Sequence, residues 1–93
     1  MNVTRYHARL RLLPCAVCVA IDENPPSRCE ELHHVGDPQT ERNDWIVVPL
    51  CHEHHEGAEG IHGLRRRGFF KKSKLSDITL LAITNKLYHG EMP

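Results

Sequence analysis

Aromatic side chains are scarce in this 93-residue sequence, which contains one Trp, two Tyr and two Phe. Long apolar runs are also missing, since no stretch approaches the roughly 18 residues of a membrane-spanning helix. A chain of this length buries only about 60–65% of its unfolded surface, and few large side chains are available to fill its core. We therefore expect a single domain over residues 1–93 that needs a stabilising element besides its core.

An excess of charge of either sign is missing as well. The 12 Lys and Arg residues balance the 12 Asp and Glu residues, which argues against a uniformly basic protein that coats nucleic acid. The opening residues 1–13 are interrupted by Arg and His and lack the apolar block of a signal peptide. We expect an intracellular protein with no membrane partner, in which cysteines ligate metal more often than they form disulfides.

The two signs of charge are nevertheless separated along the chain. Ten of the 12 acidic residues fall between Asp22 and Glu59, whereas residues 64–74 contain basic residues and no acid. This basic run comprises Arg65, Arg66, Arg67, Lys71, Lys72 and Lys74. Such a run is either a solvated helix face or a surface that holds phosphates.

Metal-binding side chains are abundant, with eight His and four Cys. Cys15 and Cys18 form a C-x2-C pair, and Cys51 and His54 form a C-x2-H pair further along the chain. Two intervening residues let a tight turn point both sulfurs inward, while residues i and i+3 at the start of a helix share one face. The two pairs predict a closed, four-ligand structural zinc site. Cys29 could replace a ligand of the second pair, but we interpret it as a buried strand residue.

The middle of the chain has the pattern of a hairpin followed by a helix. Residues 27–35 and 45–50, which are bounded by turn-forming residues, are predicted to pair as two antiparallel strands. The segment that starts at Cys51 lacks β-branched residues, so we predict a short helix that ends near Gly57 or Gly60.

The C-terminal part has a clearer helical signal. Ser76 is a suitable N-cap, apolar residues then recur at helical spacing, and Gly90 ends the pattern. The predicted fold class is a small metal-stabilised α+β domain with the order β-β-α and a C-terminal helix.

Five further histidines lie within 30 residues and are not used by the predicted zinc site: His33, His34, His52, His55 and His62. Folding of the hairpin would bring the first pair of these histidines close to those of the short helix. A second metal site is therefore predicted, with His52 interpreted as a surface residue.

The order of these motifs resembles the zinc-stabilised branch of the HNH, or ββα-metal, endonucleases. The resemblance runs from the C-x2-C pair through the doublet His33-His34 to Pro49-Leu-Cys51-x2-His54-His55. The segment Glu59-Gly-Ile-His-Gly63, with the basic run and last helix after it, is most similar to the phage recombination-enhancement nucleases. This resemblance implies a ββα-metal core, DNA as partner, a recombinase filament as a further possible partner, and the cytoplasm of a bacterial or phage-infected cell.

Carried over by position, the resemblance implies a separate catalytic site. His33 corresponds to a metal ligand and His34 to the general base, while His55 and His62 would complete the ligands of a catalytic Mg²⁺ or Mn²⁺. A set of imidazoles also suits Ni²⁺ or Zn²⁺. Because neighbours on a regular strand face opposite sides, both members of the doublet can serve one site only where the strand ends or bulges, as Gly36 suggests.

The residue that orients the general base departs from the family pattern. Many members have an asparagine five residues before the cysteine, where this chain has Ile46. Asn43 or Asp44 could hold the imidazole of His34 instead, and Asp44 would also raise its basicity.

The predicted function is metal-dependent hydrolysis of DNA phosphodiester bonds. The DNA backbone would be held by Arg65, Arg66, Arg67, Lys71 and Lys72, with at least one of Phe69 and Phe70 anchoring this segment to the core. The main alternative is a non-catalytic zinc-binding module that grips DNA or a protein. A redox protein built on the C-x2-C pair is less favoured, because no βαβ pattern accompanies the motif.

Overall fold

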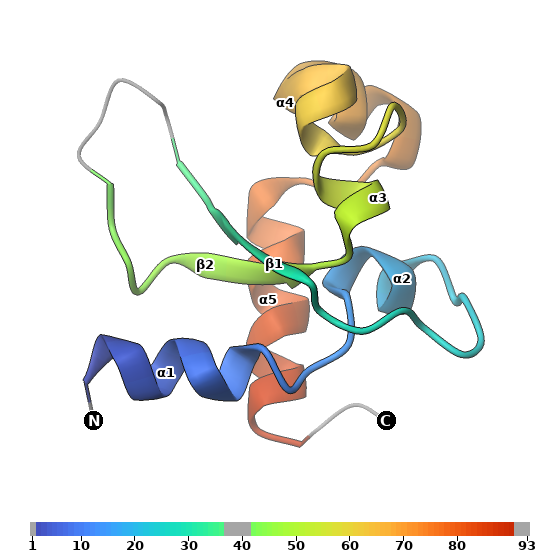
Figure 1. The fold of residues 1–93 in the computed structure, drawn as a ribbon. Coiled ribbons are helices and arrows are strands. Elements are labelled where there is room, and N and C mark those ends of the chain that lie inside the picture. The colour runs from blue at the N-terminus through green and yellow to red at the C-terminus, as the bar shows by residue number, and fades with distance from the viewer. Residues whose placement is uncertain (1, 37–41, 91–93) are drawn as a thin grey trace.

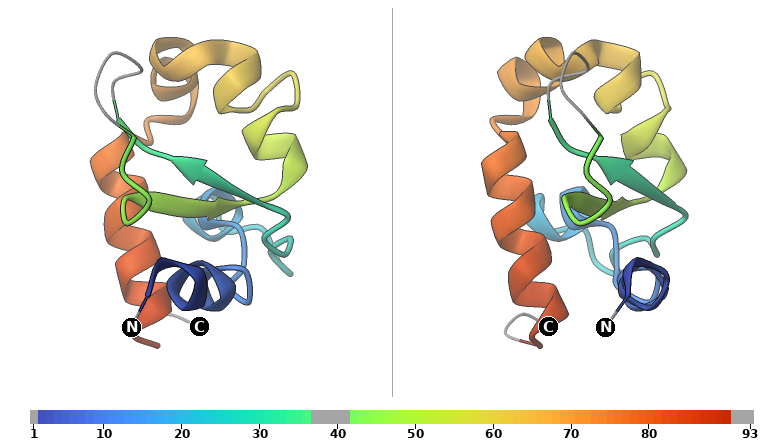
Figure 2. Two further views of the ribbon diagram at one scale, coloured as in Figure 1. Left: turned by 60° about the vertical axis from the view of Figure 1, so that its left-hand side comes forward. Right: turned by 90° about the vertical axis from the view of Figure 1, so that its left-hand side faces the viewer.

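The computed structural model describes residues 2–36 and 42–90, which form five helices and a two-stranded sheet. The helices are α1 Val3–Leu10, α2 Ala16–Ala20, α3 His52–His55, α4 Ile61–Ser73 and α5 Asp77–Tyr88; the strands are β1 Glu31–His34 and β2 Val47–Leu50. The hairpin crosses in front of α5, with α3 and α4 on one side of it and α1 on the other (Figures 1 and 2). None of the described helices combines the length and apolar character needed to cross a membrane.

The predicted hairpin is confirmed, although its strands are shorter than expected. β1 and β2 are antiparallel, with His33 opposite Val48. Most of residues 27–30 lie outside the hairpin because they pair with the segment before α2 and not with β2. There, Cys15 N donates to Ser27 O at 2.8 Å and Cys29 N donates to Leu13 O at 3.1 Å.

Two predicted helices are also confirmed. Ser76 caps α5 by accepting a hydrogen bond from Thr79 N at 3.1 Å, and the helix ends shortly before Gly90, whose φ is +72°. The short helix α3 follows Cys51 but ends at His55, before the predicted glycine. The fold is therefore a small α+β domain with the β-β-α order and a C-terminal helix.

Three helices were not predicted from the sequence. α1 has Asn2 as its N-cap, whose side chain accepts a hydrogen bond from Arg5 N at 2.9 Å. α2 occupies the C-x2-C segment, where a tight turn was expected, and has Cys15 as its N-cap. α4 includes the basic run and is kinked at Arg65, whose φ of +64° is not helical.

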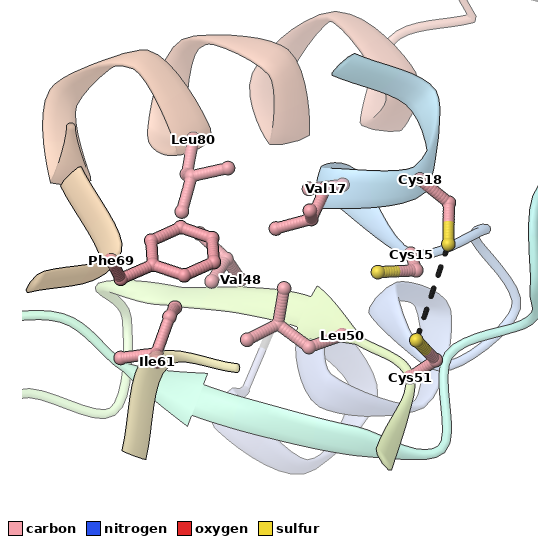
Figure 3. Packing of buried hydrophobic residues seen from close by; sticks show 10 residues of the cluster. Cys15, Val17, Cys18, Val48, Leu50, Cys51, Ile61, Phe69 and Leu80 are labelled. Atoms are coloured by element: carbon pink, nitrogen blue, oxygen red, sulfur yellow. Dashed lines mark hydrogen bonds between the residues drawn. The ribbon is translucent and has the colours of Figure 1, made fainter. Parts of the chain in front are cut away.

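The apolar core lies between β2 and the helices α2, α4 and α5 (Figure 3). All four residues of β2 are buried, so this strand has packed side chains on both faces. Phe69 anchors α4 in the core, as expected for one of the two phenylalanines, whereas Phe70 is exposed. The core and the cysteines share one buried cluster, which places the predicted zinc site at the edge of the apolar packing.

Candidate metal centres and the histidine beside them

The four predicted zinc ligands converge on one point. The sulfurs of Cys15, Cys18 and Cys51 and the Nδ1 atom of His54 all lie within 4.8 Å of one another. The distances from His54 Nδ1 to the three sulfurs are 3.7, 3.4 and 3.3 Å, and the Cys18–Cys51 Sγ distance is 4.0 Å (Figure 3). Ligands of a tetrahedral zinc, with Zn–S of about 2.3 Å, stand roughly 3.6–3.8 Å apart. The cluster therefore has the composition and size of a Cys3His zinc site.

The surroundings of these sulfurs determine the protonation of the thiols. All three cysteines are buried and free of disulfides. Burial raises the pKa of the Cys15 and Cys18 thiols above the usual value, because a thiolate is poorly solvated there. Without a cation the thiols stay protonated, whereas a zinc ion would stabilise the thiolates that bind it.

Cys29 differs from its prediction as a buried strand residue. It lies two positions before β1, is half-buried, and its thiol donates to Glu31 O at 3.3 Å. The reason is that its backbone pairs with the segment before α2 rather than with β2. Cys29 is not among the four clustered ligands.

A second cluster consists of three imidazoles from three elements. His33 of β1, His55 of α3 and His62 of α4 each have a ring nitrogen within 4.8 Å of the others. The Nε2 atoms of His55 and His62 are 3.1 Å apart, and the His33 ring centroid lies 5.1 Å from that of His55. His33 and His55 are buried while His62 is exposed. Three imidazoles that face one point at the surface suit a divalent transition metal with open positions.

Sequence patterns do not single out Glu31, yet it orients one of these imidazoles. Its Oε1 atom accepts a hydrogen bond from Nδ1 of His55 at 2.7 Å, which leaves Nε2 of that ring to face the cluster. Its other oxygen accepts from Nδ1 of the exposed His52 at 3.0 Å. The hydrogen bonds from His52 and His55 hold the pKa of Glu31 below its usual value. Alternation along β1, which puts Glu31 and His33 on one face, is the only sequence signal for this role.

The turn between α3 and α4 brings His62 to the cluster. A Cβ atom at Gly60 would lie 2.6 Å from Glu53 O, and one at Gly63 would lie 2.1 Å from Gly57 O. These contacts are closer than any side chain allows, so only glycine permits α4 to start so near α3. The two glycines of the sequence Gly60-Ile-His-Gly63 therefore allow the close approach that brings the imidazole of His62 to the cluster.

The predicted general base and its predicted partner are also in contact. His34, the last residue of β1, lies 2.8 Å through Nε2 from Oδ1 of Asp44. The hydrogen bond from His34 lowers the pKa of Asp44, so the carboxylate stays ionised. Asn43, the other candidate, instead accepts from Trp45 N at 2.8 Å. Asp44 therefore makes the orienting contact in this structure.

His34 has different surroundings from the three clustered histidines. Its Nδ1 atom accepts from Nη2 of Arg42 at 3.1 Å, and its ring lies edge-on to that of His7, with centroids 6.2 Å apart. Neither Arg42 nor His7 is distinguished by the sequence. The neighbouring residues His33 and His34 at the end of β1 thus face different groups. His33 faces the three-histidine cluster, and His34 faces Asp44 and α1.

The basic run forms the exposed surface of α4 and the residue after it. Arg65, Arg67, Lys71 and Lys72 are exposed, and the side chain of Arg66 lies outside the described part of the structure. Lys72 forms an ion pair with Glu59, so its charge is partly balanced. His62 lies in the first turn of the same helix, so the basic run and one member of the three-histidine cluster belong to one element.

Comparisons of the chain with protein-family models, with curated proteins and with solved structures found no match. The features of the chain that indicate a function are therefore the two clusters and the contacts of His34.

Proposed function

We propose that this chain is a metal-dependent DNA endonuclease of the HNH type. The observation that carries the proposal is the three-histidine cluster, which has one exposed member, His62, and shares no residue with the Cys3His cluster. A structural zinc site needs no such second cluster. His34, the last residue of β1, would act as the general base, and Asp44, which contacts it, would orient its ring.

The residues of the second cluster fit a divalent metal. His33, His55 and His62 would hold Mn²⁺ or Mg²⁺, and Glu31 keeps the His55 ring turned toward it. When bound, the metal supplies positive charge that stabilises the phosphate and the departing oxygen. Nitrogen ligands favour Mn²⁺ and other transition metals over Mg²⁺.

The contacts of His34 define where the proton would go. With Nε2–H donating to Asp44, the lone pair of the neutral ring is on Nδ1, which can take a proton from the attacking water. The nearby carboxylate stabilises the imidazolium that results. In the free protein Arg42 covers Nδ1, and we expect its guanidinium to move to a phosphate oxygen when DNA binds.

The cations of α4 would hold the DNA backbone. Arg65, Arg67 and Lys71 are exposed on α4, which also contains His62, so phosphates bound to them would belong to the same DNA segment as the reacting one. The resemblance of residues 59–63 to the phage recombination-enhancement nucleases supports a role in phage or prophage recombination, for which a recombinase filament is a candidate partner.

The proposal is tested by His34→Ala in a plasmid-cleavage assay with Mn²⁺. Loss of a general base typically reduces the rate roughly 10²- to 10⁴-fold, while folding and DNA binding should be retained. His89→Ala, which removes an exposed imidazole after α5, is the matched control and should cleave at the wild-type rate. Wild-type cleavage by His34→Ala would remove this residue from the mechanism.

The Cys3His cluster alone would also suit a non-catalytic zinc module that binds DNA or a protein. That function predicts no cleavage by the wild-type protein or by either variant, whether or not DNA is bound. Cleavage by the wild type, lost in His34→Ala, excludes it.

A further inference from the structure

One exposed aromatic ring lies directly beside the His34 pair. Trp45, the only tryptophan of the chain, follows Asp44 and is 48% exposed. Its ring packs against that of Tyr6 in α1, with centroids 5.2 Å apart, and Tyr6 in turn lies 5.4 Å from Tyr88 of α5. Trp45 is thus supported by a row of aromatic rings while about half of its surface remains open.

The helix under this ring is positively charged. α1 contains Arg5, His7 and Arg9 and no acidic residue. Arg5 and Arg9 are one turn apart on an exposed side of the helix, and Arg9 donates to the hydroxyl of Tyr88 at 3.3 Å. His7 Nε2 lies 2.6 Å from the backbone oxygen of Asp44, which ties α1 to the loop that carries Trp45.

A supported, half-open aromatic ring among cations is the arrangement by which proteins bind unpaired bases. Its position bears on the substrate, because Trp45 follows Asp44 in the chain and its partner Tyr6 is next to His7, whose ring lies edge-on to that of His34. In a regular duplex both faces of a base are covered by its neighbours, so a side chain can stack only on a base that has left the helix.

We propose that Trp45 stacks on an unpaired base next to the phosphate that is cleaved, so that the preferred substrate is single-stranded or locally unpaired DNA. This inference rests on the proposed nuclease function and specifies its substrate. Arg5 and Arg9 would neutralise the phosphates of the same strand, on the side of the hairpin opposite α4 (Figures 1 and 2).

The test is a fluorescence titration of zinc-loaded protein without other divalent metals, so that the DNA stays intact. Since Trp45 is the only tryptophan, quenching reports its ring alone. A short oligo-dT strand should quench the emission, whereas an abasic strand of equal length, which has phosphates but no bases, and a blunt duplex should not.

Trp45→Ala should weaken oligo-dT binding, measured by anisotropy, by roughly 5- to 150-fold, the range that stacking on one base provides. Binding of the abasic strand should not change. Trp45→Phe should retain most of the oligo-dT affinity, and Ile78→Ala, which shortens another exposed apolar side chain, should bind like the wild type.

Equal quenching by the oligo-dT and abasic strands, equal quenching by the duplex, or unchanged oligo-dT affinity in Trp45→Ala would each overturn the proposal. If Trp45→Ala does not fold, the wild-type titration alone decides. A failure of the nuclease proposal would appear in the plasmid assay and not in this titration, because no cleavage is measured here.

Discussion

Two carboxylates determine how individual imidazoles are presented. Glu31 accepts from Nδ1 of His55 at 2.7 Å, and Asp44 lies 2.8 Å from Nε2 of His34. Each contact fixes which ring nitrogen carries the proton and therefore which nitrogen is available. The available atom is Nε2 in the ring that would bind metal and Nδ1 in the ring that would act as a base.

Glu31→Gln should weaken Mn²⁺ binding at the three-histidine cluster by about 10- to 100-fold, since loss of a partner behind a ligand typically has this effect. Mn²⁺ affinity can be followed by the electron paramagnetic resonance signal of the free ion, and the zinc content should remain one per chain. The control is Glu53→Gln, which neutralises an exposed carboxylate of α3. Equal Mn²⁺ affinity in both variants would contradict the role of Glu31.

At this scale the sequence predicts ligands better than it predicts their partners. Cys15 and Cys18, like Cys51 and His54, are three positions apart, so local backbone geometry alone brings each pair together. Glu31 and His55 are 24 positions apart, and only the folded hairpin makes them neighbours. The contact of His34 with Asp44 was one of two predicted alternatives, the other being Asn43, and the resemblance to the HNH pattern indicated where to search.

At the scale of elements, α3 connects the two clusters. Its four residues contain His54, which faces the sulfurs, and His55, which faces His33 and His62. Cys51, the N-cap of α3, is also a sulfur ligand. A zinc ion at the first cluster would therefore hold a helix too short to be stable alone, and with it one ligand of the second cluster.

Gly63→Ala should displace the start of α4, because the added Cβ would lie 2.1 Å from Gly57 O and 2.7 Å from Ala58 O. We expect loss of Mn²⁺ binding at the second cluster while zinc is retained. The matched control is Gly68→Ala in the same helix, where a Cβ meets only Leu64 Cβ, at 3.5 Å. Gly68→Ala should keep the metal and gain about 1 kcal/mol of helix stability. Normal Mn²⁺ binding by Gly63→Ala would show that the close turn does not position His62.

The elements that sequence patterns missed have identifiable physical reasons. β2 lies in a run of β-branched and aromatic residues, and α5 contains helically spaced apolar residues, and each pattern is a signal for its element. α2 is short and hydrophobic throughout, so its sequence does not alternate between apolar and polar residues at helical spacing. In α4 the basic run and the kink at Arg65 remove the periodicity, while α1 has a cap at Asn2 but only one buried residue, Leu10.

At the scale of the whole molecule, a zinc ion in the Cys3His cluster would compensate for a small core. Three of the ten buried residues in the main cluster are cysteines of the Cys3His cluster, so core packing and metal binding would depend on each other. Structural zinc in a small domain typically contributes on the order of 10 kcal/mol of folding free energy, comparable to the whole stability of such a domain.

Cys18→Ser should therefore yield unfolded protein, because Cys18 is fully buried and lies in contact distance of two other ligands. Circular dichroism and total zinc analysis would follow the loss. Cys29→Ser, which changes a half-buried cysteine outside the cluster, should fold and bind one zinc. A folded, zinc-free Cys18→Ser protein would rule out the structural assignment of this site.

The central claim is that the two clusters bind two metals with two different roles. The most direct measurement is the rate of plasmid cleavage by the zinc-loaded protein as Mn²⁺ is added, with bound Mn²⁺ per chain measured on the same samples. We predict no cleavage with zinc alone at the Cys3His cluster, and a rate that rises with Mn²⁺ occupancy and saturates at one Mn²⁺ per chain. Cleavage that does not depend on Mn²⁺, or full Mn²⁺ occupancy without cleavage, would contradict the claim.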